Sequence, residues 1–153
     1  MCDICGGMTD DDYAMRIAGN IQLHGWTVQY VLGEDRRNPP FGYTLGLSLR
    51  GHPEFIIFNC PQDGTYKTLE PLARAVLGGR RFDEGDDLSE FYAGPEKAQL
   101  LRFPDSSTHL YAANSMFRQP GEPPVAALQV VWPSQAPLLA ETLGQQRRGR
   151  GGR

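Results

Sequence analysis

The sequence predicts an α+β fold, with an antiparallel sheet of about five strands and two or three helices packed on it, which we expect against one face. Short segments of alternating apolar and polar residues are joined by turn residues, a pattern typical of an antiparallel meander. Other segments carry apolar residues at helical spacing. With 153 residues, the chain is long enough for one domain with a sizeable core.

Three segments organise the chain. We expect residues 1–8 to form an irregular arm with a cysteine pair, residues 9–133 a single α+β domain, and residues 134–153 a divergent C-terminal extension with an Arg/Gly tail. From about Gln145 onward the sequence is too rich in glycine and arginine to bury a core. We therefore expect this tail to be disordered.

The first helix is predicted to begin near Thr9 or Asp10, where three consecutive aspartates suit the positive end of a helix dipole. Gly25 is a typical residue for its C-terminal end. Residues 26–32 then alternate between apolar and polar side chains and indicate a half-buried strand.

The clearest predicted strand spans residues 43–49. Its apolar residues fall on one face and its small residues on the other: Tyr43, Leu45, Leu47 and Leu49 against Thr44, Gly46 and Ser48. After a turn at residues 50–53, residues 54–59 are expected to return as a more buried strand.

The second half of the chain is predicted to hold a helix over residues 65–77, which Pro71 is able to break or kink. Residues 98–103 indicate a strand. A third helix begins at Asp105 or Ser106 and ends near Phe117, and residues 125–132 form a last apolar strand.

The charge is distributed unevenly. The formal net charge is −3, but the tail from Arg147 to Arg153 carries four arginines, and without it 11 basic residues stand against 18 acidic ones, a balance of −7. An acidic body argues against a broad nucleic-acid surface, so we expect only weak nucleic-acid affinity, through the tail. Apolar runs too short to span a bilayer and the lack of a signal peptide predict a soluble, cytoplasmic protein without a membrane partner.

Cys2 and Cys5 form the sharpest local motif. Two thiolates at this spacing can share one tetrahedral zinc ion or form a redox pair. Zinc needs two more ligands, for which Cys60 and one of the three histidines are the soft candidates. The alternative is an arm with two exposed thiols and no further role.

His52 and Glu54 are the candidate catalytic residues, with His24 as a third. Two residues apart at the start of a strand, His52 and Glu54 can face the same way and act as a general base pair or as part of a metal site. We expect them to border a solvent-accessible pocket. Alternatively, His24 only suits a helix C-terminus and His52 only a turn.

The small residues of the clearest strand are the candidate ligand-binding residues: Thr44, Gly46 and Ser48, together with Tyr43. A glycine in a strand marks close approach of a ligand or of another backbone. A small, hydroxyl-bearing strip suits a planar or phosphorylated ligand such as a flavin or a nucleotide. The alternative is a helix packed tightly on that face, with Tyr43 on the opposite, core-facing side.

Several short motifs follow one another along residues 1–133: Met1-Cys2-x-x-Cys5, His24-Gly25-Trp26, Phe41-Gly42-Tyr43-Thr44-x-Gly46-Leu47, Gly51-His52-Pro53-Glu54, Gly79-x-x-Phe82-x-x-Gly85, His109-Leu110 and Leu128-Gln129-x-x-Trp132-Pro133. This ordered set resembles domain-of-unknown-function family 4262 (DUF4262), a functionally uncharacterised family. The chain departs from the family pattern after Pro133. The resemblance implies no activity.

The function favoured by the sequence is a small accessory domain that binds an unknown small molecule or protein, with zinc as the metal that the N-terminal cysteines suit. One alternative is a small hydrolase or transferase that uses His52 and Glu54 with His24 nearby. Another is a flavin- or nucleotide-binding domain. No P-loop, nucleophile elbow or complete zinc quartet occurs in the sequence, so it stays open whether the protein is an enzyme. The sequence also leaves the oligomeric state open.

Overall fold

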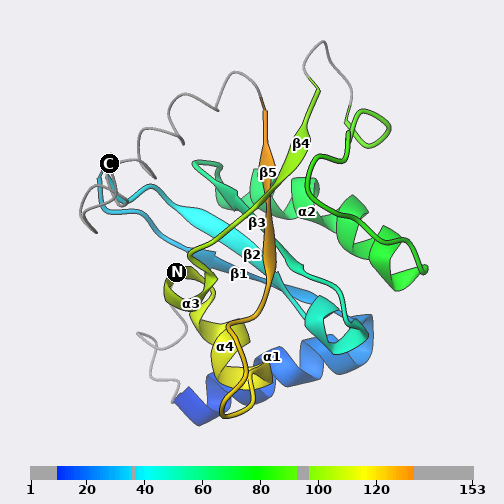
Figure 1. The fold of residues 1–153 in the computed structure, drawn as a ribbon. Coiled ribbons are helices and arrows are strands. Elements are labelled where there is room, and N and C mark those ends of the chain that lie inside the picture. Colours follow the sequence, from blue (N-terminus) through cyan, green and yellow to red (C-terminus); the bar gives the residue numbers. More distant parts are fainter. Residues whose placement is uncertain (1–9, 36, 93–96, 133–153) are drawn as a thin grey trace.

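The computed structural model describes residues 10–35, 37–92 and 97–132. In chain order its elements are α1 (Asp10–His24), β1 (Thr27–Val31), β2 (Phe41–Leu45), the 3₁₀ helix η1 (Leu47–Arg50), β3 (Glu54–Phe58), α2 (Gln62–Leu77), β4 (Gln99–Arg102), α3 (Ser106–His109), α4 (Tyr111–Phe117) and β5 (Ala127–Val131). Figure 1 shows their arrangement. The predicted α+β class and the five strands are confirmed. None of the helices in these ranges is long and apolar enough to cross a membrane.

The sheet has the strand order β1-β2-β3-β5-β4. β1, β2 and β3 form the predicted antiparallel meander, and β4 pairs antiparallel with β5. β3 and β5 are parallel, with Glu54 opposite Ala127 and Ile56 opposite Gln129. The sheet is therefore mixed, although most of its pairs are antiparallel, because the chain crosses over through α2 and β4 before it returns as β5.

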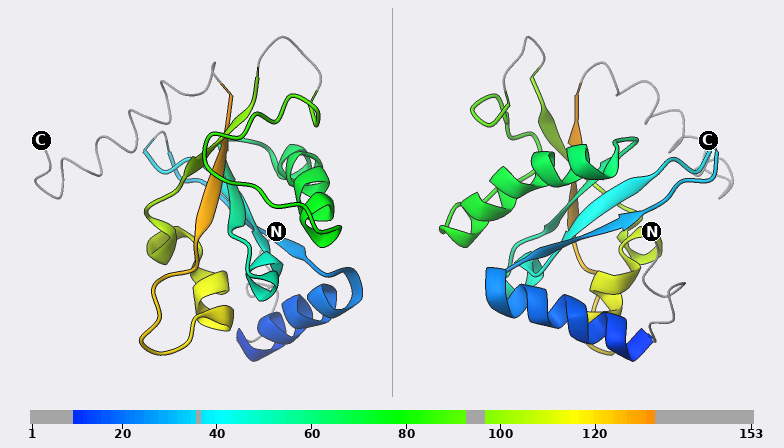
Figure 2. Two further views of the ribbon diagram at one scale, coloured as in Figure 1. Left: turned by 45° about the vertical axis from the view of Figure 1, so that its right-hand side comes forward. Right: turned by 180° about the vertical axis from the view of Figure 1, so that it is seen from behind.

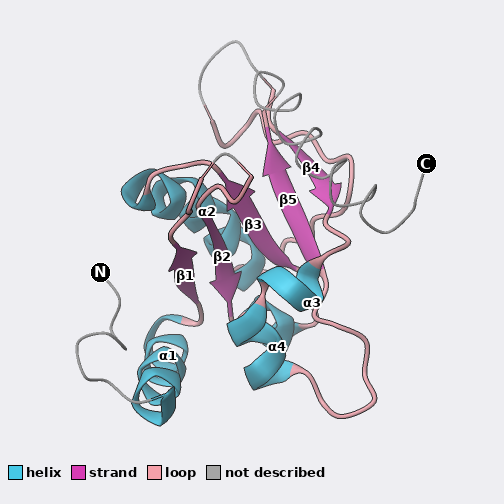
Figure 3. Cartoon of the chain, turned by 90° about the vertical axis from the view of Figure 1, so that its left-hand side faces the viewer, coloured by secondary structure: helices cyan, strands magenta, loops and turns pink. Residues whose placement is uncertain are grey.

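Helices cover both faces of the sheet, which corrects the expectation that they pack against one face. On one face Leu69 and Leu72 of α2 pack against Phe55 and Ile57 of β3. On the other face, residues of α1, α4 and the α3–α4 junction pack against the alternate positions of β3. Figures 2 and 3 show α2 on one side of the sheet and α3 and α4 on the other. Burial on both faces accounts for the uninterrupted apolar run of β3, in which every residue is buried.

The predicted strand over residues 43–49 is wrong beyond Leu45. Gly46 adopts φ 120°, and residues Leu47–Arg50 continue as a 3₁₀ helix. Leu45 and Leu47 are fully buried, whereas Leu49 is 63% exposed. The strand ends here because Gly46 takes a left-handed conformation that side-chain-bearing residues rarely adopt.

Two helix predictions change in detail. α2 begins three residues earlier than predicted and continues through Pro71, which removes one backbone donor without ending the helix. The predicted third helix is divided into α3 and α4 by Leu110, whose φ of −90° and ψ of 58° lie outside the helical region. α1 ends as predicted, because Gly25 has φ 85° and its N–H donates to the Ile21 carbonyl.

Candidate functional site

Glu54, the first residue of β3, is fully buried among backbone and hydroxyl donors. Its Oε1 accepts hydrogen bonds from the Thr44 hydroxyl at 2.7 Å and the Leu47 N–H at 3.3 Å. Its Oε2 accepts from the Gly46 N–H at 3.1 Å, the Ser48 N–H at 2.9 Å and the Ser48 hydroxyl at 2.5 Å. We call this arrangement of Thr44, Gly46, Leu47, Ser48 and Glu54 the Glu54 cradle.

The cradle sets the electrostatics of the Glu54 carboxyl. Burial raises its pKa, and the hydrogen bonds from Ser48, Thr44 and Gly46 partly oppose that increase because they favour the ionised form. The Thr44 hydroxyl also accepts from the Phe55 N–H at 2.9 Å. It therefore joins β2 both to the backbone of β3 and to the Glu54 carboxylate. With five donors around it, the carboxylate has little acceptor capacity left for a substrate.

His52 is also buried, with 3% of its surface exposed. Its Nε2 accepts from the Phe82 N–H at 2.9 Å, and its Nδ1 lies 2.7 Å from the Pro53 carbonyl oxygen. Because a backbone N–H can only donate, Nε2 is the acceptor and Nδ1 carries the proton. Burial lowers the pKa of His52, and the hydrogen bond to the Pro53 carbonyl partly opposes this. The imidazole is thus held neutral, and both ring nitrogens are engaged.

The expectation that His52 and Glu54 border a solvent-accessible pocket is wrong, since both side chains are in the interior. Each binds backbone groups of a different segment: residues 44–48 for Glu54, and Pro53 and Phe82 for His52. A catalytic role for them stays a prediction.

The small-residue strip is closed by the protein's own chain. A Cβ on Gly46 would lie 2.7 Å from the Gly25 carbonyl oxygen and 3.1 Å from the Trp26 Cα. The glycine therefore accommodates the close approach of another backbone, which is one of the two explanations that the sequence left open for it. Tyr43 faces the core as expected, with 1% exposed, and its hydroxyl accepts from the Ala112 N–H at 3.0 Å. A ligand-binding role for the strip stays a prediction.

His24 lies in a different place, at the C-terminal end of α1, where it is exposed. It lines an open groove with a volume of about 540 Å³ between α1, the start of β1 and α2. The right-hand view of Figure 2 shows the C-terminal ends of α1 and α2 beside the beginning of β1. The residues that line this groove, hereafter the α1–α2 groove, are Asn20, Leu23, His24, Trp26, Thr27, Tyr66 and Arg74.

The walls of the α1–α2 groove combine aromatic and polar groups. Tyr66 stacks on Trp26 with ring centroids 5.5 Å apart and planes 24° apart. Trp26 is 4% exposed and anchors the stack in the core, whereas Tyr66 is 45% exposed. Arg74, two turns further along α2, donates from Nε and Nη2 to the same Oε2 of Glu70, at 3.1 and 2.9 Å. Of the residues that line the groove, only His24 is among the candidate site residues predicted from the sequence.

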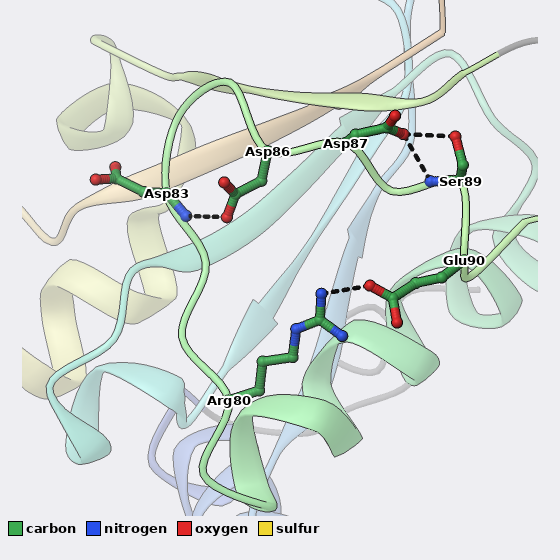
Figure 4. A network of polar contacts seen from close by, with 6 residues as sticks. All are labelled: Arg80, Asp83, Asp86, Asp87, Ser89 and Glu90. Atoms are coloured by element: carbon green, nitrogen blue, oxygen red, sulfur yellow. Dashed lines mark hydrogen bonds and ion pairs between the residues drawn. The ribbon is translucent and has the colours of Figure 1, made fainter.

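A second polar feature is the acidic loop that follows α2 (Figure 4). Arg80 pairs with Glu90, and its guanidinium lies 4.9 Å from the centre of the Phe82 ring. Asp87 accepts from the backbone and the hydroxyl of Ser89, and these hydrogen bonds lower its pKa. Across the described ranges, no group of three His, Cys, Asp or Glu side chains is arranged to hold a metal ion. Glu84 also accepts from the Arg102 N–H at 3.2 Å, and Arg81 donates to the Gly51 carbonyl at 2.8 Å, so the contacts of this loop hold it to β4 and to the turn before β3.

The predicted metal ligands Cys2 and Cys5 lie outside the described residues, as does the arginine tail. Cys60, their suggested third ligand, is a free, partly buried thiol. It lies between β3 and α2, where its backbone carbonyl accepts from the Tyr30 hydroxyl at 2.6 Å. Zinc binding by the cysteine pair stays a prediction.

Comparison with known proteins gives one match. The family model described as Domain of unknown function (DUF4262) matches residues 20–138. This span includes every residue that lines the α1–α2 groove and the whole Glu54 cradle, and it begins after Cys2 and Cys5. No curated protein and no solved structure matches the chain.

Proposed function

Since the chain belongs to the DUF4262 family, whose description names no activity, we propose its function from the geometry: it is a binding domain for a small molecule, and the α1–α2 groove is its site. The observation that carries this proposal is the groove itself. Its volume of about 540 Å³ is in the range of small-molecule sites, about 300 to 1,000 Å³.

The side chains around the groove also support a binding role. Leu23 of α1 is 78% exposed and Tyr66 of α2 is 45% exposed, and both line the groove. When a ligand covers large apolar side chains that are otherwise in contact with water, the free energy of the system falls, which favours binding. Asn20, Thr27 and Arg74 add polar groups that can orient a ligand between these walls.

Binding is favoured over acid–base catalysis because Glu54 and His52 are buried, whereas the polar side chains of the groove are not. The cradle around Glu54 and the contacts of His52 use their polar atoms to hold backbone segments together. A general base must reach the proton that it removes, either directly or through one water molecule. The polar side chains of the groove, in contrast, are accessible from outside.

Three probes of equal ring size test this function: benzoate, benzamide and benzylammonium, each titrated into the full-length protein and followed by ¹⁵N–¹H NMR. We expect at least one probe to shift amide signals of residues 20–27 and 66–74. Tyr66→Ala should weaken that binding by about threefold to tenfold, the contribution of one aromatic contact.

The matched control is Tyr111→Ala, which removes another exposed tyrosine, 76% accessible on α4, away from the groove. Its probe affinity should equal that of the unmodified protein. Two results would overturn the proposal: no probe shifts the groove signals at millimolar concentration, or Tyr66→Ala binds as well as Tyr111→Ala does.

A further inference from the structure

We propose that the ligand of the α1–α2 groove is a small organic anion, with a carboxylate or phosphate oxygen set against Arg74 and a planar ring set against Tyr66. This inference rests on the proposed function and adds the chemical class of the ligand. It follows from the hydrogen-bonding groups of the groove, from the pairing of Arg74 and from the aromatic stack.

The polar side chains that line the groove are rich in donors. Arg74 donates only, and the Asn20 amide, the Thr27 hydroxyl and the Tyr66 hydroxyl each offer a proton. The seven lining residues include no carboxylate. The Glu70 carboxylate beside the groove is paired with Arg74, so the lining donors leave a surface suited to an oxyanion rather than to a cation.

Arg74 supplies the positive charge, and its present partner holds it weakly. Its Nε and Nη2 share one oxygen of Glu70, with side-chain exposures of 68% for Arg74 and 31% for Glu70. An exposed pair one helical turn apart changes an equilibrium by only about twofold. The guanidinium fork can therefore turn to a ligand oxyanion, which it binds with two parallel hydrogen bonds.

The aromatic stack determines the other half of the ligand. Trp26 fixes Tyr66 from below, so the exposed part of the Tyr66 ring is presented in a defined orientation. Leu23 of α1 lines the same groove and is 78% exposed. A flat ring fits against these two side chains with favourable stacking, and two helical turns of α2 separate this position from Arg74.

One feature of the fold limits where the charge can lie. The C-terminal carbonyls of α1 carry negative partial charge into the same region, which disfavours an anion next to His24. The Ile21 carbonyl among them accepts from the Gly25 N–H at 2.7 Å. The oxyanion is consequently assigned to Arg74, whose guanidinium supplies the positive charge in the last turn of α2, and the ring to Tyr66.

The three ring probes discriminate between charges, and NMR titration of the full chain gives their affinities. Benzoate should bind at least about fivefold more tightly than benzamide, and benzylammonium most weakly, because a charge-assisted hydrogen bond is about twice as strong as a neutral one. Phenyl phosphate, compared with benzoate, identifies which oxyanion is preferred. Arg74→Gln should reduce benzoate affinity about tenfold and leave benzamide affinity within twofold.

Glu70→Gln should change the affinity for benzoate in the opposite direction. It releases Arg74 from its partner and removes a negative charge, so benzoate should bind about twofold more tightly. Two controls match the charge changes: Arg102→Gln, whose side chain is 65% exposed on β4, and Glu34→Gln, an exposed acid before β2. Neither should change the affinity for benzoate by more than the general effect of net charge.

The outcomes separate the two proposals. If benzamide or benzylammonium binds in the groove as tightly as benzoate does, the groove is a binding site but the anion inference is wrong. The same conclusion holds if Arg74→Gln weakens benzoate binding no more than Arg102→Gln does. If no probe shifts the groove signals, the proposed function fails as well.

Discussion

Thr44→Val is the substitution that best tests the Glu54 cradle. The β2–β3 ladder pairs Phe41 with Phe58 and Tyr43 with Ile56 and then stops, and the Thr44 hydroxyl takes over as acceptor for the Phe55 N–H. The same hydroxyl donates to Glu54 at 2.7 Å, and Thr44 is fully buried. Valine has the same shape and the same β-branch, so the change removes two hydrogen bonds without leaving a cavity.

The expected loss follows from these two bonds. An unsatisfied buried N–H at Phe55 costs about 1–3 kcal/mol, and the lost donor to a charged group about 1.5–3 kcal/mol. The better burial of a methyl group offsets about 1 kcal/mol. We therefore expect Thr44→Val to lower the free energy of unfolding by about 3 kcal/mol at neutral pH, measured by urea denaturation with an unchanged m value.

The loss should also depend on pH. The Thr44 hydroxyl lowers the pKa of Glu54, which burial raises above its ordinary value of 4.5. A raised pKa in the folded state means that the associated stability is present below pH 4.5 and is lost as the pH rises through the folded value. Thr44→Val raises this pKa further, so its penalty should be greater at pH 8 than at pH 4.5.

Thr108→Val, an exposed position in α3, is the control for replacing threonine by valine in general. A Thr44→Val loss below about 0.5 kcal/mol, the range of an ordinary surface substitution, would refute the reasoning. So would a penalty that decreases from pH 4.5 to pH 8, because the sign of the linkage would then be reversed.

Two further predictions concern His52 and Gly46. Since burial lowers the pKa of His52, the free energy of unfolding should fall as the pH drops below 6.5. His52→Gln should flatten this pH dependence in urea titrations at pH 5 to 7. An unchanged pH dependence in the variant would contradict the prediction. Gly46→Ala should cost roughly 3 kcal/mol or more, and Gly51→Ala only about 1 kcal/mol, because both glycines have positive φ but a Cβ meets the Gly25 carbonyl only at Gly46. Equal melting temperatures for the two variants would contradict the crowding argument.

The elements that depend on local pattern were predictable from the sequence. Alternation gave β1, an apolar run gave β3 and β5, and an acidic first turn with a following glycine gave α1. The end of β2 was not predictable in this way. The chain leaves the strand at Gly46 because a carboxylate at Glu54, eight residues later, accepts the N–H groups of the next turn. Periodicity within one element does not reveal this contact, because its two partners lie on different elements.

The α1–α2 groove was missed for a related reason. Its residues come from α1, the start of β1 and α2, and the one short motif among them, His24-Gly25-Trp26, indicates the family and no binding role. A partial signal was present in α2, where Tyr66, Glu70 and Arg74 recur every four residues and so share one helical face. Identifying what this face meets requires the position of Trp26, which is set by tertiary packing.

The cradle and the groove are physically connected through one backbone contact. Glu54 holds the N–H groups of Gly46 and Ser48, which fixes the first turn of η1. Gly46 in turn lies against Gly25 and Trp26, where α1 gives way to β1. Trp26 supports Tyr66, the aromatic wall of the groove. The buried carboxylate therefore helps to determine where the chain turns after β2, and that turn packs against the backbone at Trp26, which lines the groove.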